Sequence, residues 1–284
     1  MNVAAGNELA TARCRQLAER IADRLESEKQ RLQQQMATAQ AEVGVRYCVL
    51  DNLLPSEIAS EIACAFPPIK AMRLMSSFRE KKFTSKNLDQ FDPLMADVTF
   101  AVQAPSVLAL AEQITGIKNQ FADPSLYAGG LSAMGRGHFL GPHIDNSHDG
   151  SGRFYRTLNL LYYVTPDWSL ECGGNLELWD RAVKKNTTIV SNFNRLVIME
   201  TNPWSWHSVS EVKVDRIRCC VSNYYFSADS PIGQQYRNVT SFSARPEKKL
   251  LRALAWVDSN VRELVRAVAP GGVGKKDIYH RRHQ

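Results

Sequence analysis

The stretch between residues 126 and 226 constrains the fold most, because segments of strand character alternate there with turn residues. Its β-branched and aromatic runs are separated by Gly, Pro, Asn and Asp, as in GGLSAMGRGHF, RTLNLLYYVTP, GGNLELWD, TTIVSN, RLVIME and RCCVSNYYF. Many short strands at even spacing are typical of a double-sheet jelly roll. We therefore expect an α+β chain with a mainly β core, a double-stranded β-helix over about residues 125–228, and flanking helices at both ends.

The segment GPHIDNSHDG (141–150) holds the pair that most indicates a metal site. In an extended strand, residues two apart point to the same side, so His143 and Asp145 can present an imidazole and a carboxylate to one point. His207, in PWSWHSVSEV (203–212), is the best candidate for a third ligand. Two histidines and one carboxylate on one side of a metal leave the other positions open, as in non-haem Fe(II) oxygenases.

Two arginines follow in VDRIRCCVSNYYFS (214–227), where a fixed guanidinium could hold a dicarboxylate through two parallel hydrogen bonds. The whole order, HxD, a long gap, His, then Arg and an alternating strand, resembles the Fe(II)/2-oxoglutarate-dependent dioxygenases, and most of all their prolyl 4-hydroxylase-type branch. The segments 156–180, 192–201 and 218–226 add to this resemblance. It implies Fe(II) on His143, Asp145 and His207, with 2-oxoglutarate on Arg218.

The resemblance also directs attention to the groups around the co-substrate. Many relatives have a tyrosine on the strand before HxD, where this chain has Met134, so another group must assist Arg218. We name Tyr127, Asn159 and Tyr162 as candidates for binding 2-oxoglutarate.

Four further residues are candidates for contacts around the metal or with the substrate: Arg156, Asn175, Trp206 and Arg216. A structural ion pair explains Arg156 equally well, and a hydrogen bond at a strand end explains Asn175 equally well. Arg216 is expected nearer the rim, as a substrate contact or a surface charge. No catalytic residue beyond the metal centre is expected.

The chain divides into three parts by texture: a helical extension over 1–44, the dioxygenase domain over 45–245, and a C-terminal helix with a basic tail over 246–284. Residues 7–42 carry a narrow apolar stripe on a charged helix, formed by Leu9, Leu17, Ile21, Leu25, Leu32 and Met36. This stripe fits a helix packed on its own domain and a homodimerising helix or hairpin arm equally well. Residues 70–100 suggest a long loop or strand pair near the site.

Composition narrows the class of protein further. The formal net charge is +6, largely from the tail, and no nucleic-acid recognition module accompanies it, so nucleic acid is not an expected partner. No apolar run is long enough to span a bilayer, and no membrane association is expected. The six cysteines form no CxxC pair or even framework, which predicts reduced thiols and a cytoplasmic location.

The resemblance implies a hydroxylase that uses Fe(II), 2-oxoglutarate and O2, with ascorbate as a supporting reductant, and releases succinate and CO2. The substrate would be a small molecule or a peptidyl or prolyl group with an unactivated C–H bond. Two alternatives stay open. A zinc hydrolase could use the same two histidines and carboxylate, and a jelly-roll binding module could retain the site without catalysis.

Overall fold

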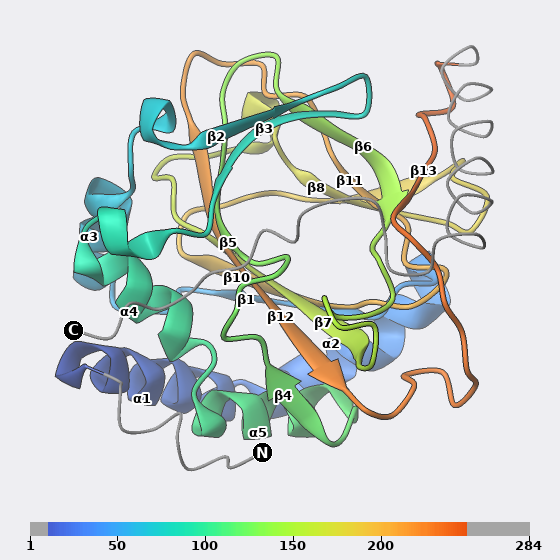
Figure 1. Cartoon of the computed structure of the whole chain (residues 1–284), viewed down its shortest axis with the longest axis horizontal. Coiled ribbons are helices and arrows are strands. Elements are labelled where there is room, and N and C mark those ends of the chain that lie inside the picture. Colours follow the sequence, from blue (N-terminus) through green and yellow to red (C-terminus); the bar gives the residue numbers. More distant parts are fainter. Residues whose placement is uncertain (1–10, 249–284) are drawn as a thin grey trace.

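The computed structural model describes residues 11–248, and its centre is one antiparallel sheet of 13 strands that curls over on itself (Figure 1). The main path of neighbouring strands is β1-β10-β7-β12-β5-β3-β6-β11-β8-β9, while β13 pairs with β6, β2 with β3 and β4 with β12. Strand β3 lies between β5 and β6 and so joins the two halves of the curled sheet. This arrangement confirms the predicted double-stranded β-helix, or jelly roll.

The strands have the following bounds: β1 Tyr47–Asp51, β2 Arg73–Ser76, β3 Glu80–Ser85, β4 Gln120–Ala122, β5 Gly130–Met134, β6 Phe139–Ile144, β7 Tyr155–Tyr163, β8 Leu176–Trp179, β9 Asn186–Ile189, β10 Arg195–Glu200, β11 His207–Val209, β12 Arg218–Ser227 and β13 Ser241–Phe242. The helices are α1 Ala12–Ser27, α2 Lys29–Val43, α3 Ser56–Ala65, α4 Pro93–Ala101 and α5 Pro105–Thr115, with short 3-10 turns at Ile69–Ala71, Leu88–Gln90 and Leu170–Cys172.

Side chains alternate along β7 and β12, and this alternation separates two environments. Leu158, Leu160 and Tyr162 face the helices, in the main hydrophobic core. Their neighbours Asn159 and Tyr163 face the inside of the curled sheet, where Tyr163 packs in a second apolar cluster with residues of β8 and β10. Apolar side chains therefore fill one region of the inner side of the curled sheet. Another region is hollow and forms the cavity described below.

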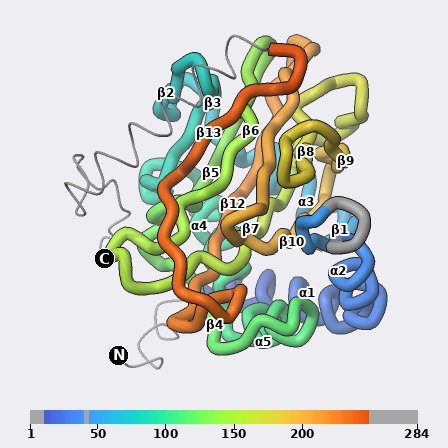
Figure 2. Tube along the Cα trace, turned by 90° about the vertical axis from the view of Figure 1, so that its right-hand side faces the viewer, coloured from blue at the N-terminus to red at the C-terminus, as the bar shows by residue number. Residues whose placement is uncertain are grey.

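The helices cover the outer face of the larger half of the sheet. Figure 2 shows α1, α2 and α5 gathered together on one side of the strands. Helix α1 begins after Thr11, whose hydroxyl accepts a hydrogen bond from the Cys14 backbone N–H, as an N-cap residue does. The helix packs against α4 and α5, and α2 packs against α5 and β1.

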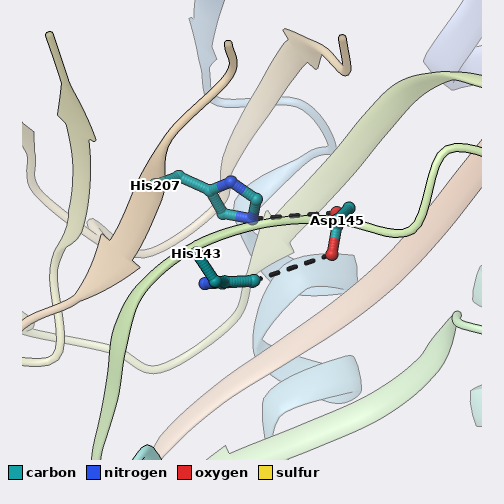
Figure 3. A group of neighbouring side chains, drawn as sticks. All are labelled: His143, Asp145 and His207. Atoms are coloured by element: carbon teal, nitrogen blue, oxygen red, sulfur yellow. Dashed lines mark ion pairs between the residues drawn. The ribbon is translucent and has the colours of Figure 1, made fainter. Parts of the chain in front are cut away.

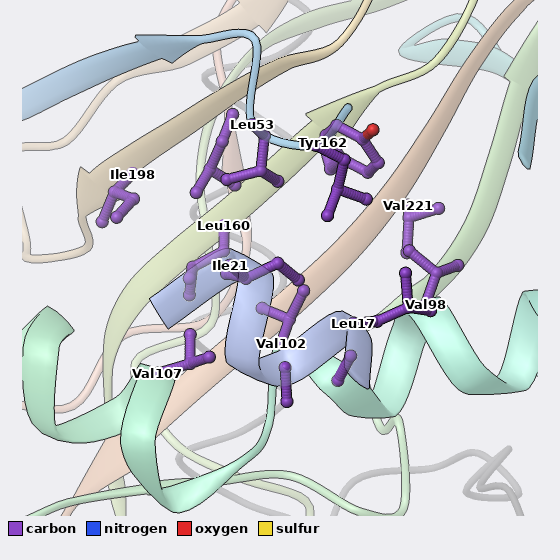
Figure 4. Close-up of a cluster of buried hydrophobic side chains, with 14 of the residues drawn as sticks. Leu17, Ile21, Leu53, Val98, Val102, Val107, Leu160, Tyr162, Ile198 and Val221 are labelled. Atoms are coloured by element: carbon purple, nitrogen blue, oxygen red, sulfur yellow. The ribbon is translucent and has the colours of Figure 1, made fainter. Parts of the chain in front are cut away.

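The apolar stripe of the N-terminal segment is buried inside this same chain. Leu17, Ile21, Leu25, Leu32 and Met36 are at most 3% exposed and belong to the main core. Figure 4 shows Leu17 and Ile21 beside Leu160 and Val102. Among the described residues, the stripe leaves no surface for a partner, so the interpretation as an arm that dimerises through it is wrong. Leu9 lies outside the described residues.

Two other predictions concern the segments around the core. The strand pair expected within residues 70–100 is confirmed as the hairpin β2–β3, although 93–101 form a helix. The predicted C-terminal helix and basic tail lie outside the described residues. Among residues 11–248, no single helix is long and apolar enough to cross a membrane, and the bent pair α4–α5 passes that test by length and composition alone. The apolar side chains of these two helices lie in the main core.

Candidate metal centre and cavity

The three predicted ligands meet at the inner surface of the smaller half of the sheet. Strand β6 carries His143, and Asp145 follows directly after the strand ends. The neighbouring strand β11 begins with His207, which lies directly opposite His143 in the antiparallel register. Ligand atoms of the three side chains lie within 4.8 Å of one another, and Figure 3 shows both imidazoles directed toward the carboxylate. The structure thus brings the predicted pair His143 and Asp145 together with the candidate third ligand, His207.

Backbone carbonyls determine which nitrogen of each imidazole faces that point. The Nδ1 atoms of His143 and His207 lie 3.0 and 2.9 Å from the carbonyl oxygens of Gly141 and Ser205. Because a carbonyl only accepts, each Nδ1 must carry its hydrogen, and the lone pair of each Nε2 points inward. Backbone contacts of this kind fix the tautomer of metal-binding histidines.

The distances between the ligands fit an ion better than direct contacts. Nε2 of His143 lies 3.7 Å from Asp145 Oδ1, and Nε2 of His207 lies 3.7 Å from Asp145 Oδ2. These separations are too long for hydrogen bonds. Moreover, Oδ2 of Asp145 is buried and has no hydrogen-bond partner among the described residues. Two neutral imidazoles and one carboxylate are also the donor set of non-haem Fe(II) sites, so these residues fit the metal.

The charges at the centre match this assignment. Burial, together with His207, lowers the pKa of His143 to about 3, so this imidazole is neutral near pH 7. Burial acts to raise the pKa of Asp145, but Arg156 and the two histidines outweigh it and lower the value to about 2. The centre therefore offers an uncharged imidazole and an ionised carboxylate, the forms that bind a metal.

Arg156 on β7 holds the carboxylate in place. Its Nη1 atom lies 3.3 Å from Asp145 Oδ1, and its guanidinium carbon lies 4.4 Å from the centre of the Tyr224 ring. The side chain is buried. Of the two interpretations of Arg156, the structure places it in an ion pair with the metal-binding carboxylate.

A cavity of about 720 Å³ opens beside the three ligands, and Arg218 lies in its wall. The guanidinium is buried at the start of β12, directly opposite Met134 on β5. Its Nη2 atom lies 2.8 Å from Met134 Sδ, and the Tyr163 ring centre lies 5.3 Å from its Cζ atom. No carboxylate of the described chain pairs with this cation.

The predicted 2-oxoglutarate ligands divide into two groups. Tyr127 and Asn159 line the cavity, and Oδ1 of Asn159 is buried without a partner among the described residues. Tyr162 does not line it, and this prediction was wrong: the ring packs in the main core, and its hydroxyl donates a hydrogen bond to Asn194 Oδ1 at 2.9 Å. Strand alternation explains the error, since Asn159 and Tyr163 share one face of β7 and Tyr162 lies on the other. Tyr163 was missed, although the same alternation could have identified it.

Three other candidates lie outside the cavity wall. The Asn175 side chain donates to the Leu170 carbonyl and accepts from the Ser191 N–H, so it joins two loops. Arg216 is exposed before β12 begins and binds the carbonyls of Pro166 and Asp167. Trp206 likewise does not contribute to the cavity lining. The structure therefore gives none of the three a contact with the metal centre.

Part of this chain is similar to known proteins. Residues 129–226 match the model of the "2OG-Fe(II) oxygenase superfamily". A curated relative, "Prolyl 3-hydroxylase OGFOD1" of Mus musculus, is 29% identical over 79 residues, which are 25% of this chain and 14% of that protein. The match thus spans only about one seventh of the relative's length.

Solved structures share the fold at low identity. One is a prolyl hydroxylase from Trichoplax adhaerens in complex with a peptide fragment of hypoxia inducible factor, with TM-score 0.50 and 19% identity over 74% of this chain and 96% of that chain. Another is the epimerase SnoN in complex with Fe3+, alpha ketoglutarate and nogalamycin RO, with TM-score 0.51 and 13% identity over 75% of this chain and 86% of that chain. Residues 129–226 of this chain are therefore similar to the 2OG-Fe(II) oxygenase superfamily, and the likeness to the solved structures is one of fold.

Proposed function

We propose that this chain is an Fe(II)- and 2-oxoglutarate-dependent dioxygenase that hydroxylates an unactivated C–H bond and releases succinate and CO2. The observation that carries this proposal is Arg218, a buried guanidinium without an acidic partner among the described residues, in the same cavity as the His143, Asp145 and His207 cluster. An unpaired buried cation is costly unless an anion occupies its site. A dicarboxylate with one end near the metal would supply that anion.

The position of each residue in the cavity determines its proposed role. His143, Asp145 and His207 would hold Fe(II) from one side and leave the side toward the cavity open, and Arg156 keeps the carboxylate oriented. Arg218 would hold the far carboxylate of 2-oxoglutarate by a two-pronged contact. The metal, when bound, supplies the oxidative chemistry with O2.

Neighbouring side chains would complete the co-substrate site. Tyr163 borders the Arg218 guanidinium, and Tyr127 and Asn159 also line the cavity. The Asn159 amide oxygen, buried without a partner in the described chain, can accept a hydrogen bond from a ligand or from water. These three residues replace the tyrosine that Met134 does not provide.

A zinc hydrolase on the same ligands is less consistent with the cavity. Such an enzyme needs a general base near the metal-bound water. The other carboxylates in the wall are Glu80, which pairs with Lys82 at 3.0 Å, and Asp149, which accepts backbone N–H groups of its own loop. Neither is placed for that role. A binding module without catalysis would not explain why the complete ligand set and Arg218 share one cavity.

The proposed substrate is either a peptidyl or prolyl group or a small molecule. The Trichoplax structure contains a peptide fragment and the SnoN structure contains nogalamycin RO, so both kinds of ligand occur on this fold. We also propose a reducing, cytoplasmic location, because all six cysteines are free thiols.

Succinate release under Fe(II), ascorbate and O2, measured over a panel of peptides and small molecules, tests the function. We expect substrate-stimulated conversion of 2-oxoglutarate that Asp145→Ala abolishes. Hydrolysis that requires Zn²⁺ and consumes no 2-oxoglutarate would instead establish the hydrolase.

A further inference from the structure

The segment 238–245 lies beside the strands that carry the two histidine ligands. Within it, β13 pairs with β6, and Figure 2 shows these two strands side by side. The end of the segment is fixed by Arg245, which pairs with the buried carboxylate of Glu177 on β8. Glu177 also accepts a hydrogen bond of 2.6 Å from the Ser208 hydroxyl, and Ser208 directly follows His207. The segment is therefore tied to both strands of the metal centre.

Asn238 contacts the backbone of the carboxylate ligand. Its side-chain Nδ2 atom donates a hydrogen bond of 2.8 Å to the carbonyl oxygen of Asp145. The Ser147 N–H donates to the Asn238 carbonyl at 3.1 Å, and the Asn238 N–H donates to the Ser147 hydroxyl at 3.0 Å. Because Asp145 lies beyond the last residue of β6, regular strand pairing does not hold it. These contacts with Asn238 fix the backbone there instead.

Phe242 contacts the ring of a second ligand. It lies directly opposite His143 in the register of β13 and β6. The two ring centres lie 5.4 Å apart, and the ring planes differ by 20°. Packing against the phenyl ring limits the rotation of the imidazole, whose Nδ1 atom faces the Gly141 carbonyl. One short segment thus contacts the backbone of one ligand and the ring of another.

The oxygen of the Asn238 side chain indicates that this residue does not serve stability alone. Its Oδ1 atom is buried and has no hydrogen-bond partner among the described residues. A buried amide oxygen of this kind costs free energy, which an apolar side chain of similar size would avoid. Side chains that break this rule are expected mainly at functional sites. The amide is therefore best explained by the bond from Nδ2 to Asp145.

We propose that Asn238 is a positioning residue of the metal centre, which holds the backbone of Asp145 so that its carboxylate meets the same metal as the two imidazoles. Phe242 supports this role by orienting His143. The inference rests on the metal site of the proposed function and extends that site to the segment 238–245. Groups that orient metal ligands typically contribute about 10–100-fold to metal affinity.

The test uses the full-length protein, titrated with Co(II) in place of Fe(II) and without 2-oxoglutarate. The visible absorption of Co(II) depends on the number and arrangement of its ligands, so one titration reports the affinity and the geometry of the site. Urea unfolding of the metal-free protein measures stability separately. We expect Asn238→Leu to weaken Co(II) binding about tenfold and to change the spectrum, while the urea midpoint stays nearly the same.

Ser241→Ala is the matched control. Its hydroxyl also donates to a backbone carbonyl, that of Val239 at 3.1 Å, but this bond lies within the segment and does not reach Asp145. The control should leave Co(II) binding unchanged. Phe242→Leu removes the stacked ring and should weaken Co(II) binding roughly three- to tenfold. This second variant decides the question in the same way if Asn238→Leu does not fold.

Two results would overturn the inference while the wild type binds Co(II) normally. The first is wild-type affinity and a wild-type spectrum in folded Asn238→Leu, which would make Asn238 a purely structural residue whatever its urea midpoint. The second is an equal loss of affinity in Asn238→Leu and Ser241→Ala, which would mean that the bond to Asp145 has no particular role. A wild type that binds no Co(II) would instead refute the metal site on which the proposed function depends.

Discussion

Replacing Arg218 should separate the stability of the free protein from its response to 2-oxoglutarate. The substitution Arg218→Met retains an apolar stem of similar length and removes a buried charge that has no acidic partner in the described chain. Because an unpaired buried cation opposes folding, we expect the free variant to be at least as stable as the wild type. Most substitutions of buried residues do the reverse.

The expected loss of affinity follows from the contact that Arg218 is placed to make. A hydrogen bond to a charged group contributes about 1.5–3 kcal/mol, and two parallel bonds allow a loss of about 3 kcal/mol, roughly a hundredfold in affinity. At a 2-oxoglutarate concentration of about 100 times the wild-type Kd, binding stabilises the wild type by about 2.7 kcal/mol. The same concentration would stabilise the variant by only about 0.4 kcal/mol.

Thermal unfolding with Mn(II), with and without 2-oxoglutarate, measures both quantities. For a domain of this size, we expect 2-oxoglutarate to raise the Tm of the wild type by about 5–10 °C and that of Arg218→Met by about 1 °C. Arg216→Met is the control, since its exposed guanidinium binds only the Pro166 and Asp167 carbonyls. A full Tm increase in Arg218→Met, or its loss in Arg216→Met, would refute the reasoning.

Three further predictions test the metal centre, the contribution of the N-terminal helices to the core, and the position of Tyr162 on the outer face of β7. Asp145→Ala should abolish turnover and sharply weaken metal binding, measured by metal content after dialysis, in a protein that remains folded. Deletion of residues 1–43 should prevent folding rather than reduce an oligomer's mass, because it removes from the main core five large apolar side chains, those of Leu17, Ile21, Leu25, Leu32 and Met36. Each is worth about 2–5 kcal/mol against a total stability of about 5–15 kcal/mol; circular dichroism and light scattering distinguish these outcomes. Tyr162→Phe should lower the free energy of unfolding by about 1 kcal/mol, through loss of its hydrogen bond to Asn194, without changing the 2-oxoglutarate affinity.

The positions of most strands and the pairing of His143 with Asp145 could be predicted because both depend on local periodicity. Residues two apart in extended backbone, such as His143 in β6 and Asp145 directly after it, share a face whatever surrounds them. The opposition of His207 to His143 across β6 and β11 is a matter of register between distant segments, and the order of motifs indicated it only through the family resemblance.

One error arose where tertiary packing decides between two interpretations of one local pattern. The stripe through Ile21 has the same spacing whether its partner is α4 of this chain or a second copy, so the sequence could not identify the partner. The prediction that Tyr162 binds 2-oxoglutarate was wrong for a different reason. Its strand was correctly predicted, and the alternation from Asn159 already excluded it from the inner face.

The pairing of Arg218 with Met134 has a consequence for how the site responds to its ligand. A thioether is a weak hydrogen-bond acceptor. The nearest partner of the guanidinium in the free protein therefore leaves most of its donor capacity unused, and Nε has no partner among the described residues. A ligand carboxylate then has only a weak acceptor of the described chain to displace, so nearly all of the charge-assisted contact contributes to binding. The same arrangement makes the free protein bear an uncompensated charge, and for this reason stability and co-substrate binding should move in opposite directions when that charge is removed.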